Sequence, residues 1–206
     1  MKKITILILT VFSINIYSQE IETENWITDL NFLKTELPKK HKNLFFKITK
    51  NEFENGIEKI IKQLDKDTDI ETSMKLHQLI AKIGDSHTSL STSHITQKRK
   101  VFPVDFMWFK EGLFISGTTK DNYEILDKKI LSINGNKINT ILDSLKTLNV
   151  AENTALIKTN SSRLLESNVI LKYFGFSKQN DSIYNLELSD INGNISHYKL
   201  MEVEND

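Results

Sequence analysis

Cysteine is absent from the 206-residue chain, so disulfides, thiolate metal sites and a cysteine nucleophile are excluded. Only 2 prolines and 7 glycines occur, which excludes collagen-like and linker-like chains. Neither sign of charge is in excess, because 27 basic residues balance 27 acidic ones. A dedicated nucleic-acid-binding protein usually carries a basic surplus, so we expect no nucleic-acid partner. The charged fraction of 26% is that of a globular protein, and the length suffices for one or two domains with their own cores.

The N-terminus has the pattern of a secretion signal. Lys2 and Lys3 precede an almost wholly apolar stretch, residues 4–16, which is followed by a polar segment that includes the small Ser18. The apolar stretch is shorter than the roughly 20 residues that a membrane-spanning helix needs, and no second apolar run approaches that length. We therefore predict a signal peptide over residues 1–18 and a mature protein that is secreted or periplasmic in a bacterium, without a membrane span. A buried first strand or helix is the alternative.

Residues 24–100 have the pattern of a helical domain. Apolar residues recur at helical spacing before Pro38, which is expected to end the first helix. Two capping boxes, each a threonine followed three residues later by a glutamate, precede the next two amphipathic runs: Thr49 with Glu52, and Thr68 with Glu71. The sequence therefore predicts three amphipathic helices.

Residues 101–206 change to strand patterning. The strand-like runs are 101–109, 113–116, 129–133, 182–188 and 195–203. Asn134-Gly135 predicts a tight turn after the third run, and short helices are expected over 138–145 and, in two pieces, over 153–174. The predicted fold class is α+β, with a helical domain at 24–100 followed by a second domain at 101–206.

Groups capable of chemistry gather in the segment Gly84-Asp85-Ser86-His87-Thr88. The glycine lies where a residue with positive φ commonly ends a helix. The imidazole of His87 suits proton transfer near neutral pH, and loops between rigid elements often hold such groups. An ordinary helix exit, in which Asp85 and Ser86 serve only turn hydrogen bonds, is the alternative. A hydrolase that uses Ser86 as nucleophile is a further one, although the second glycine of a nucleophile elbow is missing.

The other polar patterns predict no site. The histidines lack the paired spacing of a metal site, so neither a metal nor a cofactor is expected. His77 lies on an apolar helix face and is interpreted as a core residue. Ser196 and Lys199 have the Ser-x-x-Lys spacing, but on a strand their side chains point to opposite faces.

Five motifs make the chain similar to a known family. In order, they are Trp26-x-x-Asp29-Leu30, His41-Lys42-Asn43-Leu44-Phe45-Phe46, Ile83-Gly84-Asp85-Ser86-His87-Thr88, Phe102-Pro103 leading into Trp108-Phe109, and Lys129-Ile130-Leu131-Ser132-Ile133-Asn134-Gly135. Their order and spacing resemble the N-terminal part of secreted, tricorn-type members of the carboxyl-terminal-processing, or tail-specific, serine peptidase family. The resemblance spans about residues 24–203.

This resemblance implies a helical segment followed by a PDZ-like domain at 101–206. It also implies that His87 is a general base with Ser86 beside it. The nucleophilic serine of the family belongs to an α/β catalytic domain that comes last. Because the sequence ends at Asp206, where that domain is expected to begin, we expect the catalytic domain to be absent and the 206-residue chain to be inactive as a peptidase.

Two functions thus remain open besides the hydrolase that uses Ser86. The first is a truncated or fragmentary secreted serine peptidase that supplies the helical and PDZ-like parts. The alternative is a non-catalytic module of the cell envelope that binds a peptide or protein partner. PDZ domains bind a peptide as an added strand and capture its terminal carboxylate in a loop of N–H groups, for which Ser116-Gly117-Thr118-Thr119 is the nearest candidate here.

Overall fold

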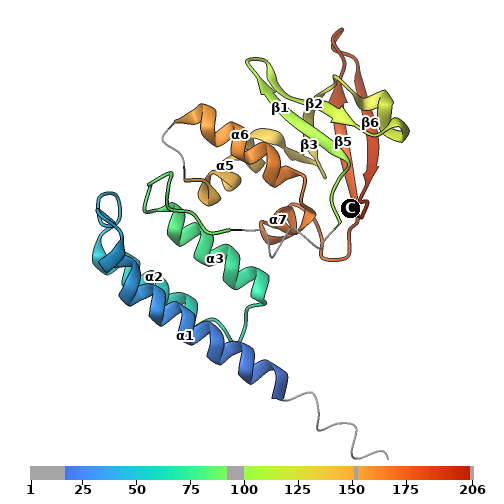
Figure 1. The fold of residues 1–206 in the computed structure, drawn as a ribbon. Helices are drawn as coiled ribbons and strands as arrows, with labels where there is room; N and C mark the ends of the chain where they lie inside the picture. Colours follow the sequence, from blue (N-terminus) through green and yellow to red (C-terminus); the bar gives the residue numbers. More distant parts are fainter. Residues whose placement is uncertain (1–16, 92–99, 151–152, 205–206) are drawn as a thin grey trace, which may run out of the picture. The chain divides into compact units, whose positions relative to one another are not determined.

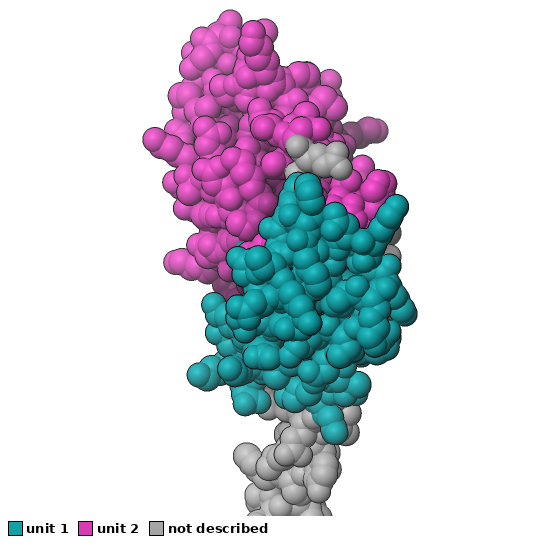
Figure 2. Space-filling view, turned by 90° about the vertical axis from the view of Figure 1, so that its left-hand side faces the viewer, with its two compact units in different colours: residues 1–79 teal, residues 80–206 magenta. Residues whose placement is uncertain are grey.

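The computed structural model describes residues 17–91, 100–150 and 153–204, so residues 1–16 of the predicted signal peptide lie outside the described part (Figure 1). The chain forms two compact units, Met1–Leu79 and Ile80–Asp206, which Figure 2 colours separately. Helices and an antiparallel sheet together give the predicted α+β fold. No helix in the described part of the chain has the length and apolar character needed to cross a bilayer.

Three helices precede the sheet: α1 Tyr17–Lys40, α2 Lys50–Ile61 and α3 Asp69–Ala81. The prediction that Pro38 ends the first helix is wrong, because α1 contains Pro38 and continues to Lys40. A proline lacks one backbone donor, and in the last turn this removes only one helical hydrogen bond. The N–H of His41 still bonds the carbonyl of Leu37 at 2.9 Å, so the helix ends two residues later than predicted.

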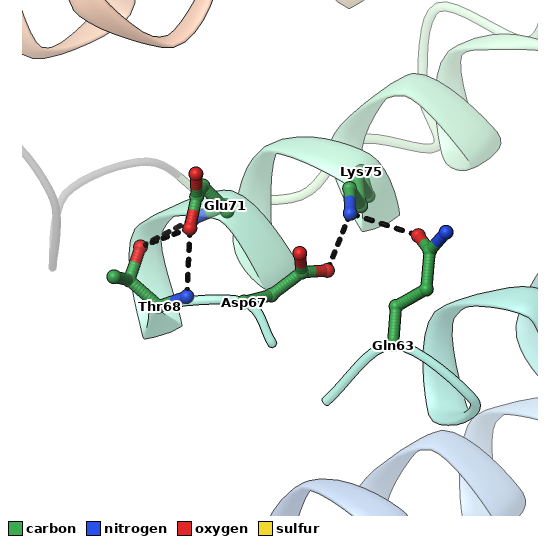
Figure 3. A network of polar contacts seen from close by, with 5 residues as sticks. All are labelled: Gln63, Asp67, Thr68, Glu71 and Lys75. Carbon is green, nitrogen blue, oxygen red and sulfur yellow. Dashed lines mark hydrogen bonds and ion pairs between the residues drawn. The ribbon is translucent and has the colours of Figure 1, made fainter. Parts of the chain in front are cut away.

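Both predicted capping boxes are confirmed. The Thr49 hydroxyl accepts the Glu52 N–H at 3.2 Å, and the Glu52 carboxylate accepts the Thr49 N–H at 2.8 Å. Thr68 and Glu71 repeat this arrangement at the start of α3, with distances of 3.3 and 2.8 Å (Figure 3). Each box satisfies backbone donors that the first turn of a helix otherwise leaves unpaired.

A lysine connects α3 to the segment before it. Lys75 donates hydrogen bonds to the Gln63 amide oxygen and the Asp67 carboxylate, both of which follow α2 (Figure 3). Lys75 lies one turn after Glu71 of the capping box. Its two hydrogen bonds therefore connect helix α3 to the segment between α2 and α3.

Removing the second capping box has a measurable cost. We expect Glu71→Ala to lower the free energy of unfolding by about 1 kcal/mol, because the Thr68 N–H loses its acceptor. Urea denaturation followed by circular dichroism measures this loss. Glu54→Ala is the matched control, since Glu54 only faces Lys50 at 3.8 Å on the surface of α2 and its removal should cost less than about 0.5 kcal/mol. Equal effects of the two variants would contradict the capping role.

The first unit buries apolar side chains from its helices and from the loop after α1. They are Leu30, Leu44, Ile48, Phe53, Ile57, Ile60, Leu64, Met74, Leu76 and Leu79. Gly56 of α2 lies against Leu79 of α3, where an added Cβ would come 2.5 Å from the Leu79 Cδ1 atom. The missing side chain at Gly56 therefore lets α2 and α3 approach at this point.

The described part of the second unit contains a six-stranded antiparallel sheet in the order β1-β2-β3-β5-β6, with β4 paired to β3. The strands are β1 Val104–Phe109, β2 Gly112–Thr118, β3 Lys129–Ile133, β4 Asn136–Lys137, β5 Ile183–Ser189 and β6 Ile195–Met201. The helices are η1 Lys120–Ile125, α5 Ile138–Leu145, η2 Lys146–Leu148, α6 Thr154–Leu165 and α7 Asn168–Tyr173. The predicted strand runs and short helices are therefore confirmed.

The turn between β3 and β4 has the predicted conformation. Asn134 and Gly135 both have positive φ, at 51° and 77°, as a two-residue hairpin turn requires. The Asn134 side chain also accepts the Asn185 N–H at 2.9 Å and donates to the Phe176 carbonyl at 3.0 Å. One turn residue thus connects β3 to β5 and to the segment after α7.

Helix α6 covers the outer strand β1. It packs against β1 and beside α5, and Figure 1 shows α6 running alongside β1. The Lys158 ammonium of α6 lies 4.9 Å from the ring centroid of Trp108 on β1, a cation–π contact. Strand β1 also carries a register shift between Asp105 and Phe106, and the Asp105 carboxylate lies over Gly117 of β2.

An aromatic pair lies at the centre of the second unit. Tyr184 of β5 is fully buried and stacks on Phe102, with 3.2 Å between ring centroids. Its hydroxyl donates to the Leu165 carbonyl at the end of α6, at 3.0 Å. Burial raises the pKa of Tyr184 well above its ordinary value, so the hydroxyl stays a donor. The pair therefore joins the sheet, helix α6 and the segment before β1.

Candidate functional site

The turn at residues 84–88 begins just after α3. Gly84 has a φ of 71°, which confirms the predicted left-handed residue after the helix. The Asp85 carboxylate accepts the His87 N–H at 3.0 Å and the Thr88 hydroxyl at 2.8 Å, and the Asp85 carbonyl accepts the Thr88 N–H at 3.0 Å. Asp85 therefore fixes the backbone of the turn through its own side chain.

His87 projects from this turn into solvent. Its side chain is exposed, whereas Ser86 beside it is half-buried. No described residue bonds the His87 imidazole, and the Asp85 carboxylate is used by the turn itself. A general base needs a partner that orients its ring and a nucleophile within hydrogen-bond reach. The turn by itself presents an accessible imidazole, and both of these groups would have to come from outside the described residues.

The remaining polar patterns are placed as follows. His77 is half-buried on α3, and no group of three or more metal-binding side chains gathers among the described residues. Ser196 and Lys199 lie on β6, where they belong to opposite faces of the strand. Ser116, Gly117 and Thr118 form the end of β2. Gly117 and Thr118 pair with β1, and Ser116 lies at the register shift, so this segment is a strand and not a carboxylate-binding loop.

Two cavities lie along the sheet, and residues 84–88 line neither of them. One, of about 430 Å³, lies near the ends of β2 and β4 and is lined by Trp108, Lys129 and Lys137 among others. The second, of about 560 Å³, lies over β3, β5 and β6. There Ser132 donates a hydrogen bond to Glu187 at 2.9 Å. The polar groups of the turn therefore lie outside these two cavities.

A carboxyl with a strongly altered pKa lies at the end of α6 and was not predicted from the sequence. Burial, and then the negative charge of Asp105, raise the pKa of the Glu166 carboxyl to about 7, while Arg163 acts in the opposite direction. The backbone carbonyl of Glu166 accepts the Phe102 N–H at 3.0 Å. Asp105 and Glu166 lie 61 positions apart in the sequence, so only the folded chain reveals their interaction.

Glu166 makes stability depend on pH in a defined direction. Its folded pKa of about 7 exceeds the ordinary 4.5, so between these values the folded state retains a proton that the unfolded state has lost. Stability should therefore fall as pH rises from about 5 to 8. Because the carboxyl keeps part of its hydration, we expect a change of about 1–2 kcal/mol. Glu166→Gln should remove this change in urea denaturation at pH 5 and 8; an unaltered pH dependence would contradict the assignment.

No protein-family model matches the chain, and no curated protein matches it. Solved structures do match. The fold is similar to part of CPAF. Mature CPAF with lactacystin has a TM-score of 0.63 and 16% identity over 87% of this chain, and a serine-to-alanine mutant of CPAF has 0.63 and 14% over 89%. Mature CPAF alone has 0.59 and 14% over 87%.

CPAF is a chlamydial serine protease of the tail-specific, C-terminal-processing type. The chain spans only about a third of the length of these structures, 34–35%. At this level of identity the likeness concerns the fold. The likeness of fold agrees with the family resemblance of the sequence motifs, because 87–89% of this chain aligns with part of CPAF.

Proposed function

We propose that this chain is the helical and PDZ-like part of a secreted serine peptidase of the carboxyl-terminal-processing family. The observation that carries the proposal is the match of 87–89% of the chain to about a third of CPAF. The five family motifs in the sequence also support it, since they occur in the order and at the spacing of that family. Export through a signal peptide at residues 1–18 belongs to the same proposal.

His87 has the role of general base in this proposal, and Ser86 is its neighbour. The imidazole would take the proton of a serine hydroxyl as that oxygen attacks a peptide carbonyl, and would then give it to the leaving amine. The exposed position of His87 on a turn fixed by Asp85 supports this role, because a nucleophile outside the described residues could approach it. Without that nucleophile the imidazole has nothing to activate.

The PDZ-like assignment of residues 101–206 rests on the succession of β3, the Asn134-Gly135 turn, β4 and α5. Capture of a free peptide C-terminus at β1 is not part of the proposal. Helix α6 packs on that strand, and the candidate carboxylate loop is a paired strand. The domain would instead hold the helical part and a catalytic domain in one chain or complex.

Two measurements test the proposed function. The purified chain should not hydrolyse casein above the buffer background, because base catalysis alone contributes only about 10²–10⁴-fold and uncatalysed amide hydrolysis is far slower than such assays detect. The DNA that follows the codon of Asp206 should encode an α/β domain with a serine nucleophile, in the same frame or in a neighbouring gene. Robust hydrolysis by the chain that persists in His87→Ala would overturn the proposal. Absence of any such coding sequence would favour the non-catalytic envelope module.

A further inference from the structure

Three of the 7 glycines in the chain directly follow an asparagine: Gly56, Gly135 and Gly193. In such a pair the backbone nitrogen of the glycine can attack the side-chain carbonyl carbon, Cγ, of the asparagine, because no Cβ on the glycine hinders the approach. The new N–Cγ bond closes a succinimide ring, the Cγ–Nδ2 bond breaks, and ammonia leaves with the proton of the glycine N–H. Water then opens the ring at either carbonyl, which gives aspartate or isoaspartate. The reaction needs an asparagine side chain that can turn onto the next backbone nitrogen.

Asn192 lies in the connection between β5 and β6, residues 190–194. Its side chain is exposed, and no described residue bonds its side-chain amide. The space beside Gly193 is open as well. Its φ is 84°, and no atom other than those of its chain neighbours lies within 4 Å of the place where a Cβ would stand. The Cγ atom of Asn192 can therefore turn toward the Gly193 nitrogen without displacing a neighbouring side chain.

One hydrogen bond has to open before this attack. The Gly193 N–H donates to the Asp190 carbonyl at 3.1 Å across the turn. The rest of the connection is held by the Asp190 carboxylate, which accepts the N–H groups of Asn192 at 2.9 Å and of Asn194 at 2.8 Å. These two bonds fix the backbone and do not involve the Asn192 side chain. Opening a single exposed turn bond costs less free energy than opening a paired strand or a helix.

The same pair at Asn134 is restrained by its side chain. The Asn134 Oδ1 atom accepts the Asn185 N–H at 2.9 Å, and its Nδ2 atom donates to the Phe176 carbonyl at 3.0 Å. Turning the Cγ atom of Asn134 toward the Gly135 nitrogen breaks both of these bonds. The reaction at Asn134 therefore requires a local opening that the reaction at Asn192 does not.

The third pair lies inside a helix. Asn55 and Gly56 both belong to α2, where the backbone nitrogens are engaged in helical hydrogen bonds. The Asn55 side-chain amide donates to the Asn51 side-chain oxygen at 3.2 Å, and Gly56 lies against Leu79 of α3. The reaction at Asn55 therefore requires α2 to open and to lose this contact.

We propose that Asn192 is a site of spontaneous covalent modification in the folded chain, and that the fold protects Asn55 and Asn134 from the same reaction. Aspartate at position 192 places a new carboxylate two residues after Asp190. Isoaspartate moves the Cβ atom into the main chain, which lengthens the connection between β5 and β6 by one atom. Either product has one more negative charge than the parent chain, whose 27 basic residues balance 27 acidic ones, so ion exchange separates the two forms.

Incubation of the purified chain at neutral pH, followed by tryptic peptide mapping, tests the proposal. Trypsin cleaves after lysine and arginine, so the three pairs fall on separate peptides, residues 51–59, 130–137 and 179–199. Mass spectrometry of fragment ions locates the replacement of the side-chain NH2 by OH, and a sample taken at time zero corrects for reaction during digestion. We expect the product at Asn192 to form at least about tenfold faster than the product at Asn134, because two hydrogen bonds hold the Asn134 side chain.

Two variants on the same tryptic peptide provide the controls. Asn192→Ser should remove the product from residues 179–199. Asn180→Ser should leave its rate unchanged, since Asn180 is also exposed but precedes an aspartate. In urea the three pairs should react at similar rates, because the fold no longer restrains any of them. Equal rates at Asn134 and Asn192 in the folded chain, or no product at Asn192, overturn the proposal. A preference for Asn192 that persists in urea overturns it as well, because the fold would then not be its cause.

Discussion

Replacing His87 by alanine should lower peptidase activity by about 10³-fold or more in a protein or complex that joins this chain to its catalytic domain. The reason is that the imidazole would be the group that takes and returns the proton of the nucleophile, and loss of a general base typically costs about 10²–10⁴-fold. The measurement is kcat/KM with a fluorogenic peptide. The His87 side chain is exposed, so His87→Ala should leave the thermal midpoint of unfolding unchanged.

Substitutions of two serines in the same loop, Ser86 and Ser89, distinguish a catalytic role of Ser86 from a structural one. Ser86→Ala should reduce kcat/KM by less than His87→Ala, because Ser86 adjoins the base and does not transfer the proton. Ser89 is exposed three residues later, and Ser89→Ala is the matched control with no expected effect. If Ser86→Ala abolished activity while His87→Ala did not, the serine would be the nucleophile and the roles assigned by the family resemblance would be wrong.

Tyr184→Ala should lower the free energy of unfolding of the second unit by about 3–5 kcal/mol. The substitution empties a fully buried site, ends the stacking on Phe102 and leaves the Leu165 carbonyl without its hydroxyl donor. Domains of this size are stable by only about 5–15 kcal/mol, so the loss is a large fraction of the total. Tyr184→Phe keeps the ring and should cost about 1–2 kcal/mol, since it removes the hydrogen bond alone.

Fluorescence can follow this unfolding in the second unit. The chain contains 2 tryptophans, Trp26 in the first unit and Trp108 on β1, so a Trp26→Phe background leaves Trp108 as reporter. Urea titrations of Trp108 emission then give the difference between variants. Tyr123→Ala is the control for a tyrosine truncation, because Tyr123 is 68% exposed and should change stability by less than about 0.5 kcal/mol. Similar losses at the two tyrosines would exclude a central role for the buried pair.

Local features of this fold could be predicted from the sequence. The capping boxes at Thr49 and Thr68 and the turn at Asn134-Gly135 depend on residues within about four positions of one another, and all three are confirmed. Such features follow from the hydrogen-bonding groups and allowed φ values of a few residues. Pro38 shows the limit of this local reasoning, since one missing donor did not stop α1 when the last turn could still close.

Features that depend on distant residues could not be predicted in the same way. The strand order, the packing of α6 on β1 and the interaction of Asp105 with Glu166 join segments far apart in the chain. The candidate site could be predicted from the sequence only in part. The sequence identified the residues of the 84–88 turn and left open whether Asp85 serves only turn hydrogen bonds. The structure shows that Asp85 bonds the turn, and that no carboxylate among the described residues bonds the His87 ring.

The close approach of Asp105 to Gly117 links the residue type at position 117 to the pKa of Glu166. A Cβ at position 117 would occupy the space of the Asp105 carboxylate, so any side chain there must displace that charge. The same charge contributes to the raised pKa of Glu166. A larger residue at position 117 would therefore also change the proton affinity of the Glu166 carboxyl, because it would displace the Asp105 charge.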